Sequence, residues 1–212
     1  MDVIKIEGLE KSYGDFRLGP FDLRVEPGAI LTVTGHPNGG KTTLLRLMWG
    51  FERPTKGRIE IFGMQPHLEQ IRVRQRAGYA GDHTWYYPEL STEAFLEFVG
   101  AFHEKWDQAY ALTLLKDFRI SNWHLISEIS HQDRRRLGVV AALGHRPSLV
   151  ILDQPAAGLD DKMRKHMIRL LKKLAQEEKV TVVVSTNIAD DLDQIGDGTL
   201  VLNHGNVMES TY

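Results

Sequence analysis

The segment that most constrains this chain is a glycine-rich stretch at residues 35–43, with the sequence GHPNGGKTT. It matches the pattern G-x-x-x-x-G-K-[ST], in which backbone N–H groups of a loop cradle phosphate. The apolar run at 29–34 predicts a buried strand, and the amphipathic run at 42–49 predicts a helix. Because the pattern needs this strand–loop–helix context, we expect an α/β fold with a phosphate-binding loop. The alternative is an ordinary glycine turn between a strand and a helix.

The residue types in this loop suit a nucleoside triphosphate. A helix N-terminus presents unpaired N–H groups and a partial positive charge, and glycines let the backbone curl around a phosphate. Lys41 would add positive charge at the β- and γ-phosphates, and the Thr42 hydroxyl would be a ligand of Mg²⁺. The loop alone chooses neither ATP over GTP nor hydrolysis over binding. The expected nucleotide contacts here are Asn38, Gly39, Gly40, Lys41, Thr42 and Thr43.

A second element of the phosphate site follows an apolar run at residues 149–152, which predicts a strand covered on both faces. In phosphate-loop proteins an acidic residue at the end of such a strand, here Asp153, holds Mg²⁺; the alternative is an Asp that caps the next turn. The following residue is Gln154, whose amide orients a water but accepts no proton near neutral pH. Losing a general base costs about 10²–10⁴ in rate, so we expect weak hydrolysis.

The remaining patterns predict an α/β lobe that carries an antiparallel β portion, with a helical lobe inserted into it. Apolar runs predict strands at 3–6, 21–25, 58–62, 77–80 and 180–184, and a hairpin over 199–208 that turns at His204 and Gly205. Helical periodicity predicts helices at 70–76, 92–103, 107–118 with Asp107 as N-cap, 133–143 and 161–176. We expect a single domain over residues 1–212, with a core lobe at 1–82 and 146–212 and a helical lobe at 83–145.

Composition excludes several classes of function. The chain has no cysteine, which excludes disulfides, thiolate metal sites and a cysteine nucleophile. No run approaches 18 apolar residues, and the first residues lack a signal-peptide pattern, so we expect a soluble cytoplasmic protein. The net charge is −2, and we interpret Arg134, Arg135 and Arg136 as a solvated helix face, so no nucleic-acid partner is expected.

With its motifs in this order, the chain resembles the nucleotide-binding subunit of an ATP-binding-cassette (ABC) transporter. Tyr13, in the sequence KSYG, matches an aromatic residue that stacks on adenine in that family, although a buried tyrosine at a strand end is the alternative. Residues 77–82 resemble the loop that joins the two lobes, with Asp82 where the family has Gln. Asp82 would still ligate Mg²⁺ or a bound water. Residues 184–187 resemble the switch segment, with Asn187 in place of its histidine.

The family signature LSGGQ is replaced here by ISHQD at residues 129–133. Ser130 retains a hydroxyl that could donate to phosphate. His131 and Gln132 replace glycines: either His131 donates to phosphate when protonated, or both side chains turn to solvent. Asp160 ends a segment that resembles the loop crossing the dimer interface. Asn38 replaces a glycine of the usual phosphate loop, and Asn tolerates the left-handed backbone conformation.

The resemblance implies an ATP-binding subunit that couples ATP–Mg²⁺ binding and dimer closure to transport. The implied partners are a transmembrane subunit and either a second copy or another nucleotide-binding subunit, at the inner face of the cell membrane. Aromatic residues at 84–88 would line a groove for the membrane subunit or pack into the core. Because Gln154, Asn187, His131 and Gln132 all depart from the family pattern, we expect slow hydrolysis. A non-catalytic, nucleotide-gated regulatory module and a soluble ABC protein outside transport are the alternatives.

Overall fold

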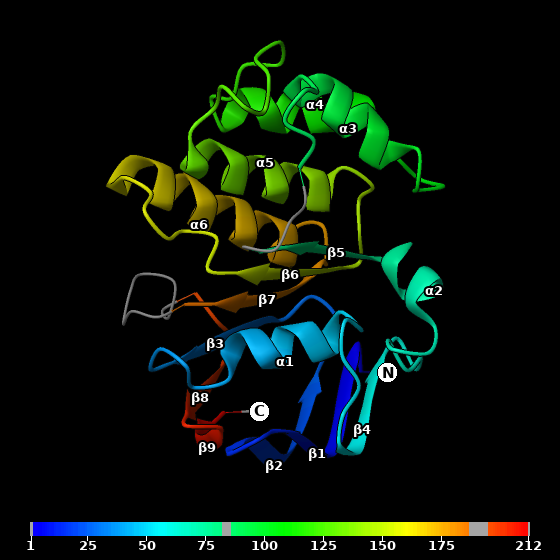
Figure 1. Ribbon diagram of the computed structural model, residues 1–212, viewed down its shortest axis with the longest axis vertical. Helices are drawn as coiled ribbons and strands as arrows, with labels where there is room; N and C mark the ends of the chain where they lie inside the picture. The colour runs from blue at the N-terminus through cyan, green and yellow to red at the C-terminus, as the bar shows by residue number, and fades with distance from the viewer. Residues whose placement is uncertain (1, 82–85, 187–194, 212) are drawn as a thin grey trace.

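The computed structural model describes residues 2–81, 86–186 and 195–211 (Figure 1). The predicted Asp82 and Asn187 sites therefore lie outside the described residues, as does Trp85 of the aromatic segment. In chain order the elements are β1 (Ile4–Tyr13), β2 (Phe16–Val25), β3 (Ile30–Gly35), α1 (Lys41–Met48), β4 (Lys56–Ile61), α2 (Gln70–Arg74), β5 (Ala77–Ala80), α3 (Thr92–Gly100), α4 (Gln108–Asp117), α5 (His131–Leu143), β6 (Leu149–Asp153), α6 (Asp161–Gln176), β7 (Thr181–Ser185), β8 (Gly198–Asn203) and β9 (Asn206–Ser210).

The strands form two sheets. A six-stranded sheet has the order β5-β6-β7-β3-β8-β9, with parallel pairing except between β8 and the final strand β9. A three-stranded antiparallel sheet has the order β2-β1-β4. The predicted α/β class with an antiparallel portion is confirmed, as is the hairpin that turns at His204 and Gly205.

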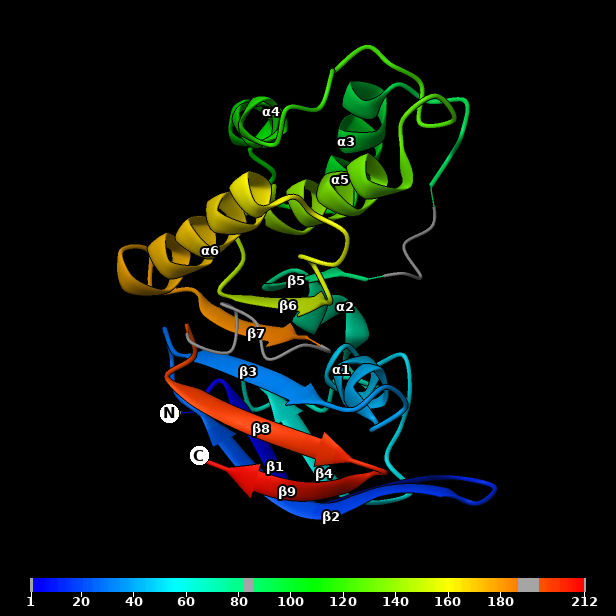
Figure 2. The ribbon, with the colours of Figure 1, turned by 90° about the vertical axis from the view of Figure 1, so that its left-hand side faces the viewer.

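Apolar side chains on the two faces of the six-stranded sheet belong to separate clusters. Along β6, Val150 and Leu152 pack with residues of α3, α4, α5 and α6, whereas Leu149 and Ile151 pack with α1 and the three-stranded sheet. All five residues of β6 and all five of β7 are buried, as their continuous apolar runs predicted. Figures 1 and 2 show α3–α6 at one end of the molecule, the three-stranded sheet at the other and α1 between them.

Capping side chains decide where several helices begin. Asp107 is the N-cap of α4, as predicted, since its Oδ1 accepts a hydrogen bond of 2.9 Å from the Tyr110 N–H. Helix α5 begins at His131, two residues before the predicted start, because Ser130 caps it. Helix α3 ends at Gly100, three residues before the predicted end, and the Gln75 amide donates a bond of 2.7 Å to the carbonyl of Phe102 beyond it.

We expect Gly78→Ala to lower the free energy of unfolding by about 2–3 kcal/mol, because it would overpack the core. A Cβ on Gly78, in β5, would lie 2.0 Å from the carbonyl oxygen of Ala142 in α5. That atom belongs to the helix backbone, so β5 and α5 would have to separate. Thermal unfolding followed by circular dichroism should show a melting temperature lower by roughly 5–10 °C. A change within about 1 °C would contradict this account of the contact.

Candidate nucleotide-binding site

The glycine-rich segment joins β3 to α1 and lines a hollow of about 510 Å³, which we call the phosphate hollow. Helix α1 begins after Gly40, whose φ of 105° lies in the left-handed region that favours glycine. No side chain caps this helix and its first turn has no acidic residue, so no carboxylate of the helix itself occupies its N-terminus beside the hollow. The residues that line the phosphate hollow are Phe16, Pro37, Asn38, Gly39, Gly40, Lys41, Thr42, Thr43 and Gln154.

Asn38 has a φ of 62°, so it adopts the left-handed conformation considered for it from the sequence. The turn is closed by the Gly39 N–H, which donates a hydrogen bond of 3.0 Å to the carbonyl of His36. The His36 side chain is exposed. The six predicted contact residues from Asn38 to Thr43 therefore lie together around one hollow.

Lys41 is held against the loop by its own ammonium group. Its Nζ donates hydrogen bonds of 2.7 Å to the carbonyl oxygens of Gly35 and His36, and the residue is 4% exposed. Burial lowers the pKa of this ammonium below its ordinary value, and the carboxylate of Asp153 partly opposes the shift. An anion in the hollow would give Lys41 a stronger partner than two neutral carbonyls.

Asp153, at the end of β6, is the centre of a small buried polar group. Thr42 Oγ1 donates a hydrogen bond of 2.7 Å to its Oδ2, and Ser185 Oγ donates to its Oδ1. Asp153 and Ser185 are register partners at the ends of the parallel strands β6 and β7, which explains their proximity. The structure thus brings together two of the three predicted Mg²⁺ ligands, and the third, Asp82, lies outside the described residues. Sequence reasoning missed the contribution of Ser185, for which the signal was a serine directly after an apolar run.

The oxygens of Thr42 and Asp153 are the hard ligands that Mg²⁺ takes in phosphate sites. The described residues contain no group of three or more His, Cys, Asp or Glu side chains that could hold a metal ion. Mg²⁺ in phosphate sites usually combines one or two protein oxygens with phosphate and water, and the pair Thr42 and Asp153 suits that arrangement.

Gln154 follows Asp153 and lines the phosphate hollow. Its φ is 52°, a left-handed conformation. Its N–H donates a hydrogen bond of 3.0 Å to Ser185 Oγ, and its carbonyl accepts one of 3.1 Å from the N–H of Ala157. Two hydrogen bonds thus fix the backbone of Gln154, whose side-chain amide can orient a water but cannot accept its proton.

The aromatic residue that lines the hollow is Phe16, at the start of β2. Tyr13, the residue expected to stack on adenine, lies at the end of β1 opposite Phe16 in the register. The two rings are stacked with centroids 6.5 Å apart, and Tyr13 is 42% exposed. The alternative of a buried tyrosine is therefore wrong. Sequence reasoning missed Phe16, whose signal was its position across the tight turn from Tyr13.

The segment at 129–133 forms the start of α5, away from the phosphate hollow: none of Ser130, His131, Gln132 and Asp160 lines it. His131 and Gln132 are exposed in the single chain. Asp160 is the N-cap of α6, and its Oδ1 accepts a bond of 2.7 Å from the Met163 N–H. Gln132 lies beside the loop before α6, since a Cβ on Gly158 would be 3.3 Å from its Nε2.

The interpretation of the arginine run as a solvated helix face is wrong, because Arg134, Arg135 and Arg136 are all half-buried. Two of them bond to backbone carbonyls: Arg135 donates to that of Gln154 at 3.5 Å, and Arg136 donates to that of Phe118 at 2.7 Å. For the aromatic segment, core packing is confirmed at Tyr86, and the groove for a membrane subunit stays a prediction. Tyr86 packs on Phe95 in the core, whereas Tyr87 is 44% exposed.

Comparison with known proteins gives consistent matches. The sequence profile of the family described as ABC transporter matches residues 18–157. The bacitracin transport ATP-binding protein BcrA of Bacillus licheniformis is 30% identical over 98% of this chain and 69% of its own length. The daunorubicin resistance ATP-binding protein DrrA3 of Streptomyces coeruleorubidus is 34% identical over 97% of this chain, which spans 66% of that relative's length.

Among solved structures, the dimeric structure of MJ0796, a bacterial ABC transporter cassette, superimposes with a TM-score of 0.89. The match has 24% sequence identity and covers 98% of this chain and 97% of that one. A post-hydrolysis dimer of the same cassette, bound to ADP and Pi, has a TM-score of 0.88. Across the described residues, no helix is both long and apolar enough to cross a membrane.

Proposed function

Because this chain belongs to the ABC transporter family, we propose that it is the ATP-binding subunit of a membrane transporter, in which ATP–Mg²⁺ binding and dimer closure drive transport. The observation that carries the proposal is the phosphate hollow, where Lys41, Thr42 and Asp153 converge on the uncapped N-terminus of α1. We assign the chain to one nucleotide-binding domain, with a core lobe at 1–82 and 146–212 and a helical lobe at 83–145.

The proposed nucleotide is ATP with Mg²⁺. The loop N–H groups and the N-terminus of α1 would bind the phosphates, and Lys41 would move from its two carbonyl partners to a phosphate oxygen. Thr42 and Asp153 would hold the metal, which supplies positive charge beside the phosphates when bound. Ser185 keeps the Asp153 carboxylate oriented toward Thr42.

The proposed partners are a transmembrane subunit and a second nucleotide-binding subunit, either a copy of this chain or a different cassette. The names of the relatives, which include transport and resistance ATP-binding proteins, support the first partner. The dimeric cassette with the same fold supports the second. We place the chain in the cytoplasm at the inner face of the cell membrane.

We further propose that hydrolysis is slow. Gln154 occupies the phosphate hollow where a general base would act, and an amide lacks that function. His131 and Gln132 in the signature segment, and Asn187 in the switch segment, add to the departure from the family pattern.

Gln154 also supports a second candidate function, a nucleotide-gated regulatory subunit that closes on ATP without turning it over. Measuring binding and turnover on the same preparation separates the two. Saturable ATP binding with no turnover above background supports the regulatory subunit.

The proposal is tested by calorimetric titration of the purified chain with ATP, with and without Mg²⁺. We expect saturable binding at micromolar to low millimolar ATP that tightens when Mg²⁺ is present. No saturable binding in this range would overturn the proposed function. Pull-down from native membranes with ATP–Mg²⁺ present then tests for the transmembrane partner.

We expect Phe16→Ala to weaken ATP binding about tenfold, because stacking between an aromatic side chain and a base contributes about 1–3 kcal/mol. Phe16 is the aromatic ring that lines the phosphate hollow, and Tyr13 stacks behind it. The measurement is a fluorescence titration with a labelled ATP analogue. Phe102→Ala is the control, since that ring is 65% exposed and does not line the hollow. If Tyr13→Ala weakens binding and Phe16→Ala does not, the assignment of Phe16 is wrong.

A further inference from the structure

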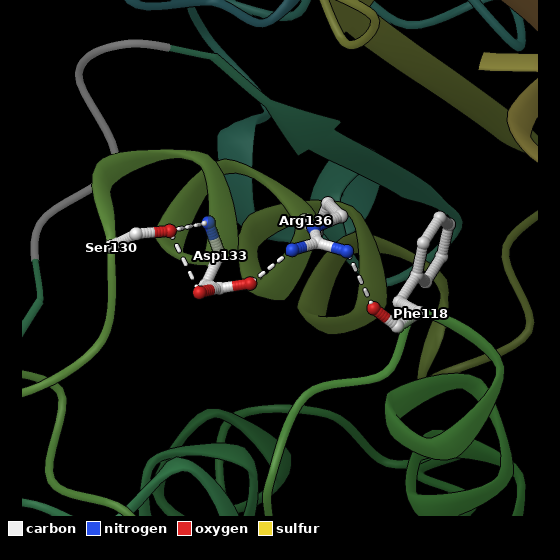
Figure 3. A network of polar contacts seen from close by, with 4 residues as sticks. All are labelled: Phe118, Ser130, Asp133 and Arg136. Atoms are coloured by element: carbon white, nitrogen blue, oxygen red, sulfur yellow. Dashed lines mark hydrogen bonds and ion pairs between the residues drawn. The ribbon is translucent and has the colours of Figure 1, made fainter. Parts of the chain in front are cut away.

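The N-terminus of α5 is closed by a chain of hydrogen bonds within the protein (Figure 3). Ser130 Oγ accepts a bond of 3.0 Å from the backbone N–H of Asp133 and donates one of 2.7 Å to the carboxylate Oδ2 of the same residue. The other carboxylate oxygen pairs with Arg136. Arg136 in turn donates a bond of 2.7 Å to the carbonyl of Phe118, which is fully buried just after α4.

This chain of contacts fixes the direction of the Ser130 hydroxyl. A serine hydroxyl has a single proton to donate, and here it is directed to the Asp133 carboxylate. Arg136, whose side chain is 14% exposed, holds the carboxylate from the other side. Moving the Ser130 proton to another acceptor would therefore break a charge-assisted hydrogen bond.

The two helices that matter for phosphate binding thus begin in opposite ways. Helix α1 has no capping side chain and no acidic residue in its first turn. Helix α5 has a capping serine and Asp133 in its first turn. A carboxylate at a helix N-terminus occupies the position that favours a negative ligand, and it repels a second anion there.

We propose that Asp133 is a positioning residue that withholds the Ser130 hydroxyl from phosphate, so that α5 is a poor partner for a nucleotide bound to an opposing subunit. This inference rests on the proposed function and on the family resemblance, which implies that the signature segment at 129–133, and with it the start of α5, faces the ATP bound to the opposing subunit. It deepens that function by assigning the weak phosphate binding of the α5 N-terminus to Asp133, which Arg136 holds in place. In a dimer, the chain would then contribute a phosphate hollow that can bind ATP, and an α5 whose N-terminus is already capped by its own Ser130 and Asp133.

The test is ATP-driven association of the full chain, measured by sedimentation velocity with ATP–Mg²⁺. We expect Asp133→Ala to strengthen association about tenfold, the effect of one hydrogen bond to a charged group. Asp133→Asn should give a smaller gain, because its amide oxygen still accepts the Ser130 proton. Ser130→Ala placed on Asp133→Ala should abolish the gain. Asp161→Ala is the matched control, since it removes an acidic residue from the first turn of α6, where Asp160 is the N-cap.

Circular dichroism establishes that each variant keeps its helices, and Asp133→Asn carries the test if Asp133→Ala does not fold. The inference is overturned if the folded variants associate no more tightly than the unaltered chain, if the gain survives Ser130→Ala, or if Asp161→Ala gives the same gain. Titration of the unaltered chain with ATP separates the two proposals. Binding without any effect at Asp133 overturns this inference alone, whereas no ATP binding overturns the proposed function together with it.

Discussion

A Lys41→Met variant is expected to lose ATP affinity by roughly ten- to a hundredfold, the effect of losing a hydrogen bond from a charged donor. Lys41 is the buried cation of the phosphate hollow, and its partners in the free chain are the carbonyls of Gly35 and His36. Methionine keeps most of the side-chain volume, so the loop keeps its packing while the charge is lost. Fluorescence titration with a labelled ATP analogue measures the loss.

Lys172→Met is the matched control for this variant, because Lys172 is exposed on α6 and does not line the hollow. It should bind ATP as the unaltered chain does. Equal affinities for Lys41→Met and the unaltered chain would place the phosphates elsewhere and contradict the assignment of the hollow.

The unaltered chain is expected to hydrolyse ATP at less than about 0.1 per second. A typical enzyme turns over at about 10 per second, and the absence of a general base lowers such a rate by about 10²–10⁴. Gln154 lies in the phosphate hollow with its backbone held by Ser185 and Ala157, so a glutamate would occupy the same place. Gln154→Glu should raise the rate by less than this factor, because His131, Gln132 and Asn187 stay altered. A steady-state phosphate-release assay gives both rates.

Background from contaminating ATPases is controlled with Lys41→Met, which should remove any turnover that belongs to this chain. Turnover of several per second in the unaltered chain, abolished by Lys41→Met, would contradict the proposed impairment. Gln154→Ala separates the charge of the new carboxylate from loss of the amide, since only Gln154→Glu should accelerate the reaction.

Much of the fold could be predicted because its signals are local. The phosphate loop lies between its predicted strand and helix, and α6 covers the predicted residues 161–176. The runs of β6 and β7 are apolar at nearly every position because helices and a second sheet cover both faces. Helix ends were less predictable: Ser130 extends α5 by two residues through a side-chain bond that helical periodicity does not encode.

The candidate site was predictable only in part. Thr42 and Asp153 were identified from motifs, and in the structure Thr42 Oγ1 lies 2.7 Å from Asp153 Oδ2. Phe16 and Ser185 were missed because their roles come from pairing between strands: Phe16 faces Tyr13 across the β1–β2 turn, and Ser185 is the register partner of Asp153. The exposure of the arginine run was predicted wrongly, because charge alone does not show that Arg136 donates a hydrogen bond to the carbonyl of the buried Phe118.

The sequence by itself determined the phosphate loop, the family resemblance and the α/β class, since each depends on residue types at fixed spacing along the chain. Only the tertiary structure decided that Phe16 lines the hollow, that Ser185 orients Asp153, and that Asp133 takes the Ser130 proton with Arg136 as its anchor. The physical reason is that hydrogen bonds and ring contacts depend on distance in space. Residues 16 and 40, or 118 and 136, become neighbours only when the sheets and helices pack.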